Sequence, residues 1–122
     1  MTYRLSRIMS AATASYGVFA LAFPRHLGNA LTTNPLKQAD YDVLARTYGA
    51  RDLTVSAVGL LARSEAAVTA AMVVRIASDL SDCMLLTRQA EDSTARAKVL
   101  GVTLGWAALN LAALVADRRR AA

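Results

Sequence analysis

Six ionisable residues stand inside stretches of sequence that are otherwise long and apolar. Three are basic and three are acidic: Arg46, Arg51, Asp52, Arg75, Asp79 and Asp82. An Arg or Asp at the centre of a membrane-spanning helix costs about 2.5–3.5 kcal/mol, so such charges must be paired if these stretches cross a bilayer. A buried carboxylate can also act as a general acid or base, and a guanidinium can stabilise developing negative charge. The set therefore indicates either an ion-pair network or a site of acid–base chemistry.

The spacing of the last three charges places them together. Arg75 precedes Asp79 by four residues, and Asp82 follows three residues later. At about 100° per residue, these three side chains share one face of a helix. The other faces of that helix remain apolar, so the charged face must find its partners on a neighbouring helix.

Depth along a helical hairpin predicts those partners. If the two charged helices reverse near Arg63, residues at equal depth have numbers that sum to about 127, because both helices rise at the same rate. Three opposite-sign pairs meet this condition closely: Asp52 with Arg75, Arg46 with Asp82, and Arg51 with Asp79. We therefore expect a buried ladder of three ion pairs. Its candidate catalytic residues are Asp52, Arg75 and Asp79, and its ion-pair partners are Arg46, Arg51 and Asp82.

Other common chemistries lack their residues. The chain has one histidine, His26, and one cysteine, Cys83, so an internal disulfide and a Cys/His zinc cluster are excluded. It contains neither the G-x-x-x-x-G-K-[ST] phosphate-binding loop nor the G-x-G-x-x-G dinucleotide motif. We interpret His26 as a solvated or interfacial loop residue and Cys83 as a helix-packing residue. No cofactor and no metal is expected.

Composition predicts the elements that carry the charges. The 122 residues suffice for a single domain over residues 1–122 with one core. Hydrophobic residues make up 55% and charged residues 19%, against about 25% charge in an ordinary soluble domain. With only two prolines and six glycines in an alanine-rich chain, helix is favoured over sheet. The expected fold class is all-α.

Four helices are predicted, over about residues 6–23, 43–62, 66–86 and 97–116. Pro24 ends the first helix, and residues 24–39 form a long connection of turn-forming residues. Ser64 caps the third helix and leaves a tight hairpin between the second and third. Residues 99–116 carry no charge, and this length crosses a bilayer core. We therefore expect an up-down-up-down four-helix transmembrane bundle. A soluble or oligomeric bundle, with residues 99–116 as a fully buried core helix, stays open as the alternative.

Basic residues flank the apolar stretches. The net charge is +5, but the basic residues form no stripe interleaved with aromatic residues, so nucleic acid is excluded as a partner. Basic residues are slightly more numerous on the side of the two termini, which predicts that both termini are cytoplasmic. A cleaved N-terminal signal or an organellar presequence stays open. So does a homo-oligomer, since Gly101 and Gly105 form a G-x-x-x-G motif that serves contacts within or between chains.

The segment from Tyr48 to Leu53, which contains Gly49-Ala50-Arg51-Asp52, resembles a family of small four-helix integral-membrane proteins catalogued as domain of unknown function 4267. The resemblance includes Phe23-Pro24 at the end of the first helix and the charges from Arg75 to Asp82. It implies residence in a membrane. The family has no general assigned activity, but some relatives occur among fungal biosynthetic genes, which by analogy implies handling of a hydrophobic metabolite.

Two classes of function remain. The first is a membrane isomerase, cyclase or epoxide-opening enzyme that binds a hydrophobic small molecule between its helices. Asp52 or Asp79 would be its general acid or base, and the pocket would be lined by Tyr16, Tyr48 and Trp106. The second is a non-catalytic membrane scaffold or accessory subunit whose Arg/Asp pairs are structural, with a carrier as a third reading. An apolar cavity on which the charges converge would favour the first, and a filled core the second.

Overall fold

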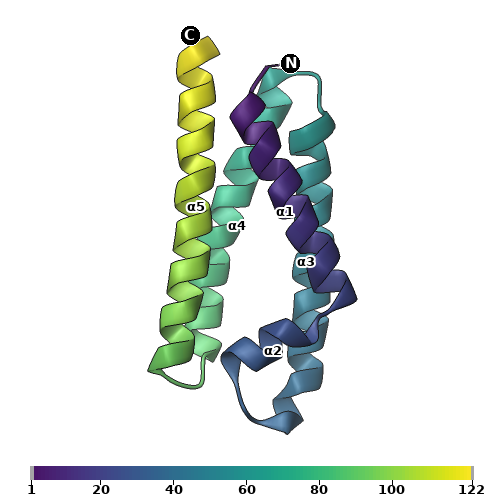
Figure 1. Ribbon diagram of the computed structural model, residues 1–122, viewed down its shortest axis with the longest axis vertical. Coiled ribbons are helices and arrows are strands. Elements are labelled where there is room, and N and C mark those ends of the chain that lie inside the picture. Colours follow the sequence, from purple (N-terminus) through teal and green to yellow (C-terminus); the bar gives the residue numbers. More distant parts are fainter. Residues whose placement is uncertain (1, 122) are drawn as a thin grey trace.

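The computed structural model describes residues 2–121, and within that range it contains helices and no strand (Figure 1). The five α-helices are α1 (Arg4–Ala22), α2 (Arg25–Leu31), α3 (Gln38–Leu61), α4 (Glu65–Gln89) and α5 (Ser93–Ala121), with a 3₁₀ turn over Pro35–Lys37. The predicted all-α class is confirmed. The prediction of four helices missed one, because residues 2–121 form five α-helices.

The additional helix, α2, lies in the connection that was predicted to be irregular. Pro24 ends α1 and also begins α2, since its φ of −65° and ψ of −23° suit the first turn of a helix. Leu27 and Leu31 of α2 are buried in a cluster with Tyr41 and Ala45 of α3. Packing against α3 therefore stabilises a helix of only seven residues, which is too short to form alone.

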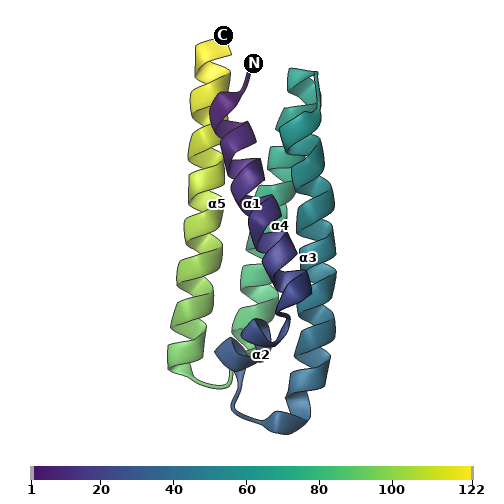
Figure 2. The ribbon, with the colours of Figure 1, turned by 45° about the vertical axis from the view of Figure 1, so that its right-hand side comes forward.

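The long helices alternate in direction. Figures 1 and 2 show both termini at the same end of the molecule as the turn between α3 and α4, while α2 and the turn between α4 and α5 lie at the other end. The α3–α4 turn is tight, as predicted, and the hydroxyl of Ser64 caps α4 by accepting a hydrogen bond from the amide of Ala67 at 3.1 Å. The charged segments of α3 and α4 therefore run antiparallel at matched depths.

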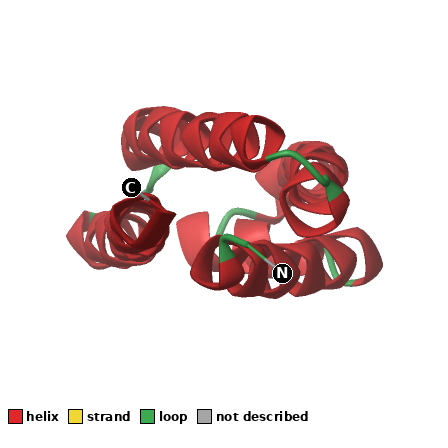
Figure 3. Cartoon of the chain, turned by 90° about the horizontal axis from the view of Figure 1, so that it is seen from above, coloured by secondary structure: helices red, strands yellow, loops and turns green. Residues whose placement is uncertain are grey.

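The helices pack as two close pairs, α1 with α3 and α4 with α5, seen from above in Figure 3. Within the first pair the backbones approach at Gly17 and Gly49, where a Cβ on Gly49 would lie 2.8 Å from the carbonyl oxygen of Gly17. Gly101 and Gly105 behave differently, since a Cβ on either would meet nothing within 4 Å. Their G-x-x-x-G motif therefore faces away from the described chain, and a homo-oligomer stays a prediction.

Among the described residues, α5 is the one helix long and apolar enough to cross a bilayer by length and composition. Only 33% of its most apolar stretch is buried inside the protein. The apolar surface of this helix is therefore mostly turned outward.

Candidate functional site

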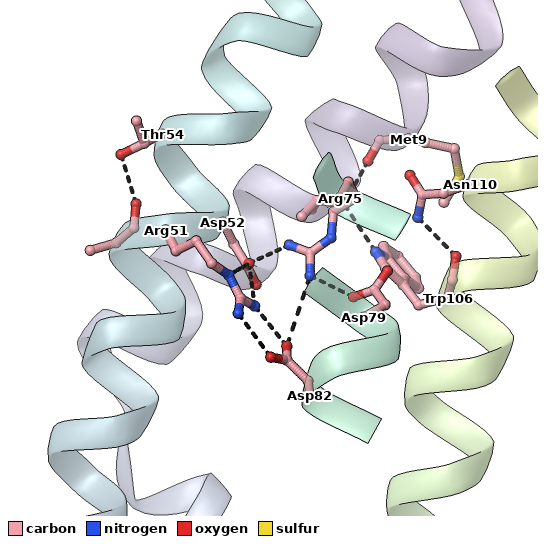
Figure 4. A network of polar contacts seen from close by, with 11 residues as sticks. Met9, Arg51, Asp52, Thr54, Arg75, Asp79, Asp82, Trp106 and Asn110 are labelled. Atoms are coloured by element: carbon pink, nitrogen blue, oxygen red, sulfur yellow. Dashed lines mark hydrogen bonds and ion pairs between the residues drawn. The ribbon is translucent and has the colours of Figure 1, made fainter. Parts of the chain in front are cut away.

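Five charged side chains form one connected set between α3 and α4, which we call the Arg/Asp network (Figure 4). It consists of Arg51 and Asp52 from α3 and Arg75, Asp79 and Asp82 from α4. Asp52 joins its two halves, because one of its oxygens accepts hydrogen bonds from both arginines. The network is therefore continuous rather than a series of separate pairs.

The contacts of each arginine are specific. Arg51 forms a bidentate pair with Asp82, with Nη–Oδ distances of 2.8 and 2.7 Å, and its Nη2 lies 2.9 Å from Asp52 Oδ1. Arg75 donates to Asp52 through one terminal nitrogen and to Asp79 Oδ1 through the other at 2.5 Å. Such charge-assisted bonds are about twice as strong as neutral ones.

Only one of the three predicted ion pairs is present as predicted. Asp52 pairs with Arg75, but Asp82 bonds Arg51 instead of Arg46, and Asp79 bonds Arg75 instead of Arg51. Arg46 is exposed and lies outside the network. Depth matching fixes height along a helix but not rotation about its axis, and six residues separate Arg46 from Asp52, which turns it roughly 120° away.

Most of the network is buried. The exposed fractions are 5% for Asp52, 4% for Arg75, 5% for Asp79 and 8% for Asp82. Arg51 is less deeply buried, and its guanidinium lies 4.6 Å from the ring centroid of Tyr48, in the geometry of a cation–π contact. Charges at this burial are tolerated only when they are paired and hydrogen-bonded.

The network forms one wall of an apolar cavity of about 330 Å³. Asp52, Arg75, Asp79 and Asp82 all line it, and the other walls come from α1, α2, α3 and α5. The predicted aromatic lining is confirmed, since the cavity is bordered by Tyr16, Tyr48 and Trp106. Its volume falls at the lower end of the range of small-molecule sites. The space beside the network is a pocket that is partly open to the outside.

Three polar atoms of the cavity wall are buried without a hydrogen-bond partner among the described residues. They are Asp79 Oδ2, Arg75 Nε and Tyr48 Oη. Most buried polar groups in native proteins are satisfied, because leaving one unpaired costs about 1–3 kcal/mol. Each of these three residues also lines the cavity.

Sequence reasoning missed His26, which it placed in a loop. His26 lies on α2 and lines the cavity, with Nε2 3.0 Å from Tyr16 Oη and Nδ1 2.8 Å from the carbonyl oxygen of Phe23. A carbonyl only accepts, so Nδ1 carries the proton and Nε2 accepts the hydrogen of Tyr16. The Tyr16–His26 pair therefore lies at the cavity with both ring nitrogens hydrogen-bonded. The one signal for this position was Pro24, which begins helices as readily as it ends them.

Within the described residues, no group of three or more His, Cys, Asp or Glu side chains is arranged to hold a metal ion. The three carboxylates of the network are engaged by guanidinium groups instead. Cys83 is free and buried, in agreement with its interpretation as a packing residue.

A scan against protein-family models, a search of curated proteins and a search of solved structures each give no match. The resemblance to domain of unknown function 4267 is thus neither supported nor contradicted and stays a prediction. What the fold and the cavity define is a small all-helical protein with a charged network beside an apolar cavity that is partly open to the outside.

Proposed function

We propose that this chain is a small integral membrane protein that binds a hydrophobic small molecule in the cavity and transforms it by acid–base chemistry. The candidate catalytic residues are Asp52, Arg75 and Asp79. The proposal depends mainly on one observation, an apolar cavity whose charged wall holds an unpartnered carboxylate oxygen, Asp79 Oδ2. A concave apolar site with a few convergent polar groups is the usual form of a small-molecule site.

The distribution of side chains supports the membrane part of the proposal. Over residues 66–87 of α4 all three charged residues are buried, and residues 99–116 of α5 contain none. Large apolar side chains are exposed over the same stretches, with exposed fractions of 53% for Val73, 62% for Met84 and 69% for Val102. Soluble monomers rarely expose large apolar patches around a charged interior. Stretches of about 20 residues are long enough to cross the hydrocarbon core.

In this arrangement α1, α3, α4 and α5 are the four helices of an up-down-up-down transmembrane bundle. The short α2 lies at the membrane interface, at the end away from the termini. Both termini are placed in the cytoplasm, where the basic residues Arg118, Arg119 and Arg120 follow the positive-inside tendency. Membership of the family catalogued as domain of unknown function 4267 belongs to the same proposal.

The chemistry follows from groups that face the cavity from two sides. Arg75 holds Asp52 and Asp79 in place, and the unpartnered Oδ2 of Asp79 would accept a proton from a ligand. The Tyr16–His26 pair, from α1 and α2, provides a second proton-handling group. An isomerisation or a cyclisation needs one group that removes a proton and another that supplies one. An isomerase or cyclase is therefore the favoured class of enzyme.

The alternative function is a non-catalytic membrane scaffold or accessory subunit. It is favoured by the completeness of the ion pairing, since Arg51, Asp52 and Asp82 are bonded within the network and tie α3 to α4. A satisfied network of this kind specifies which helix faces turn inward without any chemistry.

Filling the cavity separates the two functions. Ala30→Trp places a bulky side chain in the cavity lining, and Ala108→Trp places the same side chain on the exposed face of α5 as a matched control. We expect the wild type and the control to copurify with a hydrophobic compound, detected by mass spectrometry of solvent extracts, and Ala30→Trp to lose it. That compound is then the substrate for turnover assays with Asp79→Asn. An extract that is identical for all three proteins would support the scaffold.

A further inference from the structure

Asp79 carries the atom that defines the polar group of the ligand. Its side chain is 5% exposed and lines the cavity; Oδ1 accepts a hydrogen bond from Arg75, and Oδ2 has no partner within residues 2–121. An ionised carboxylate oxygen accepts hydrogen bonds but cannot donate them. A hydrocarbon, an ether or a ketone would leave this oxygen unsatisfied. The complementary ligand therefore carries an O–H or N–H donor.

The charges around the cavity favour a neutral donor over an ammonium group. Three carboxylates, Asp52, Asp79 and Asp82, are paired with two guanidinium groups, Arg51 and Arg75, and the exposed Lys98 borders the cavity as a third basic group. An ammonium group at Asp79 would stand beside the guanidinium of Arg75, which is bonded to the same carboxylate. Like charges repel strongly in a buried, low-dielectric site. A hydroxyl donates its hydrogen without this repulsion.

The hydroxyl of Tyr48, another residue of the cavity wall, also favours a hydroxyl group on the ligand. Tyr48 is 8% exposed, and its hydroxyl has no hydrogen-bond partner among the described residues. A ligand hydroxyl both donates and accepts, so it can serve a carboxylate and a phenol, whereas an ammonium group has no lone pair to offer. Much of the remaining lining is apolar, including Leu27, Leu86 and Val99.

From these unpartnered atoms and the charges around them, we infer that the ligand is a neutral apolar alcohol whose hydroxyl donates to Asp79 Oδ2. The inference rests on the proposed function, because it names the ligand class of the same cavity. At about 30 Å³ per water-sized group, the cavity of 330 Å³ accommodates roughly a dozen non-hydrogen atoms. A compact or cyclic alcohol of that size fits it.

Three probes on one carbon ring test the assignment: cyclododecanol, cyclododecanone and cyclododecylamine. Trp106 is the one tryptophan of the chain and lines the cavity, with its Nε1 bonded to Thr13 at 3.0 Å, so its fluorescence reports binding. The full chain is titrated in lipid nanodiscs. The alcohol is expected to bind at least about tenfold more tightly than either the ketone or the amine, the effect of one hydrogen bond to a charged group.

Asp79→Asn sharpens the test without a change in size. The carboxamide can keep an oxygen toward Arg75 and turn its N–H donors to the cavity, so the preference is expected to move from the alcohol to the ketone. Asp42→Asn, at a carboxylate that does not line the cavity, is the matched control and should keep the wild-type order. If Asp79→Asn does not fold, Tyr48→Phe should lower the affinity for cyclododecanol and leave unchanged that for cyclododecane, a further probe with the same ring and no polar group.

The outcomes distinguish this inference from the function beneath it. Equal affinities for the alcohol and the ketone, or tighter binding of the amine, would overturn the alcohol and leave the cavity as a binding site. A Trp106 signal that none of the three probes changes would contradict the binding function itself.

Discussion

Two buried polar clusters lie inside the molecule, and they satisfy their polar atoms in different ways. Near the termini, both carboxylate oxygens of Asp117 accept hydrogen bonds from backbone amides, those of Leu5 at 3.3 Å and Ser6 at 2.6 Å. Arg7 donates to two backbone carbonyls, of Thr2 at 2.7 Å and Leu60 at 2.9 Å. In the Arg/Asp network, by contrast, side chains bond side chains. Each cluster leaves polar atoms without a partner, the Ser6 hydroxyl near the termini and Asp79 Oδ2 in the network.

The difference separates a structural cluster from one that is suited to a ligand. The first residue before α1 is Tyr3, which provides no side-chain cap, so Asp117 from α5 satisfies amides of the first turn of α1. The terminal cluster thus completes helix ends. The Arg/Asp network caps no backbone group, and its unpaired atoms belong to residues of an apolar cavity, whereas the pocket of about 420 Å³ beside Asp117 is lined largely by polar and charged residues. A polar atom without a partner in the protein can form a hydrogen bond with a ligand in the cavity.

Arg75→Gln is expected to have the largest effect on stability. It leaves the carboxylates of Asp52 and Asp79 without their shared guanidinium, and breaking a buried pair in this way costs about 3–5 kcal/mol. The measurement is unfolding of the purified protein in detergent. Asp79→Asn should cost less, because Arg75 keeps its contact with Asp52. Equal losses of stability in the two variants would contradict the view that only one of the two carboxylate oxygens of Asp79 contributes to the fold.

The charge-swapped double variant Asp52→Arg/Arg75→Asp should not restore that stability. Separate pairs would be rescued by such a swap, but here the new arginine would lie beside Arg51 and the new aspartate beside Asp79. We expect the double variant to be at least as unstable as Arg75→Gln in the same unfolding assay. Recovery to the wild-type stability would show that the contacts act as independent pairs.

Asp117→Ala should give an intermediate loss, confined to the terminal cluster. Removing a side chain that caps a helix costs about 1–2 kcal/mol, and both hydrogen bonds to α1 disappear together. The affinity of the cavity for its ligand, measured by Trp106 fluorescence, should remain that of the wild type. A loss of affinity equal to that in Asp79→Asn would remove the distinction between the two clusters.

Residue type and spacing were sufficient to predict all five members of the Arg/Asp network, but they also added Arg46, which lies outside it. They gave the face shared by Arg75, Asp79 and Asp82, and the Asp52–Arg75 pair. The prediction failed for Arg46, which is exposed. The position of a residue within an apolar stretch indicates its height along the helix, but not the direction in which its side chain points from the helix axis. The remaining pairings depend on that rotation, which is set by the packing of whole helices.

The second failure concerns α2 and His26. A helix of seven residues is too short for the 3.6-residue period to emerge, and Gly28 and Asn29 in its interior favour turns. The stability of α2 comes from tertiary contacts with α3, which the local sequence pattern of α2 does not report. The Tyr16–His26 pair therefore could not be predicted, since it exists only because α2 folds back against the end of α1.

Tyr16→Phe tests whether that pair forms, with a small expected effect on stability. Loss of one neutral hydrogen bond costs about 0.5–1.5 kcal/mol. Because His26 is the one histidine of the chain, its ring nitrogens give a single set of ¹⁵N signals. In the wild type we expect a proton on Nδ1, held by the carbonyl of Phe23, and a shift of the Nε2 signal in Tyr16→Phe. A spectrum unchanged by the substitution would remove the pair from the proposed chemistry.

The smallest effect on stability is expected outside both buried clusters, at the exposed ion pair between Arg25 and Asp42. Arg25 Nη2 lies 2.7 Å from Asp42 Oδ2. The hydrogen bond from Arg25 holds the pKa of Asp42 below its ordinary value. A group whose pKa is lowered on folding stabilises the fold above its unfolded pKa, about 3.9 for Asp, and loses this contribution as pH falls through the lowered value. The difference in melting temperature between wild type and Asp42→Asn should therefore be present at neutral pH and vanish in acid. If this difference in melting temperature grows in acid, Arg25 does not stabilise the ionised carboxylate. If the difference at neutral pH is as large as that caused by Asp117→Ala, an exposed ion pair can contribute as much stability as a buried helix cap.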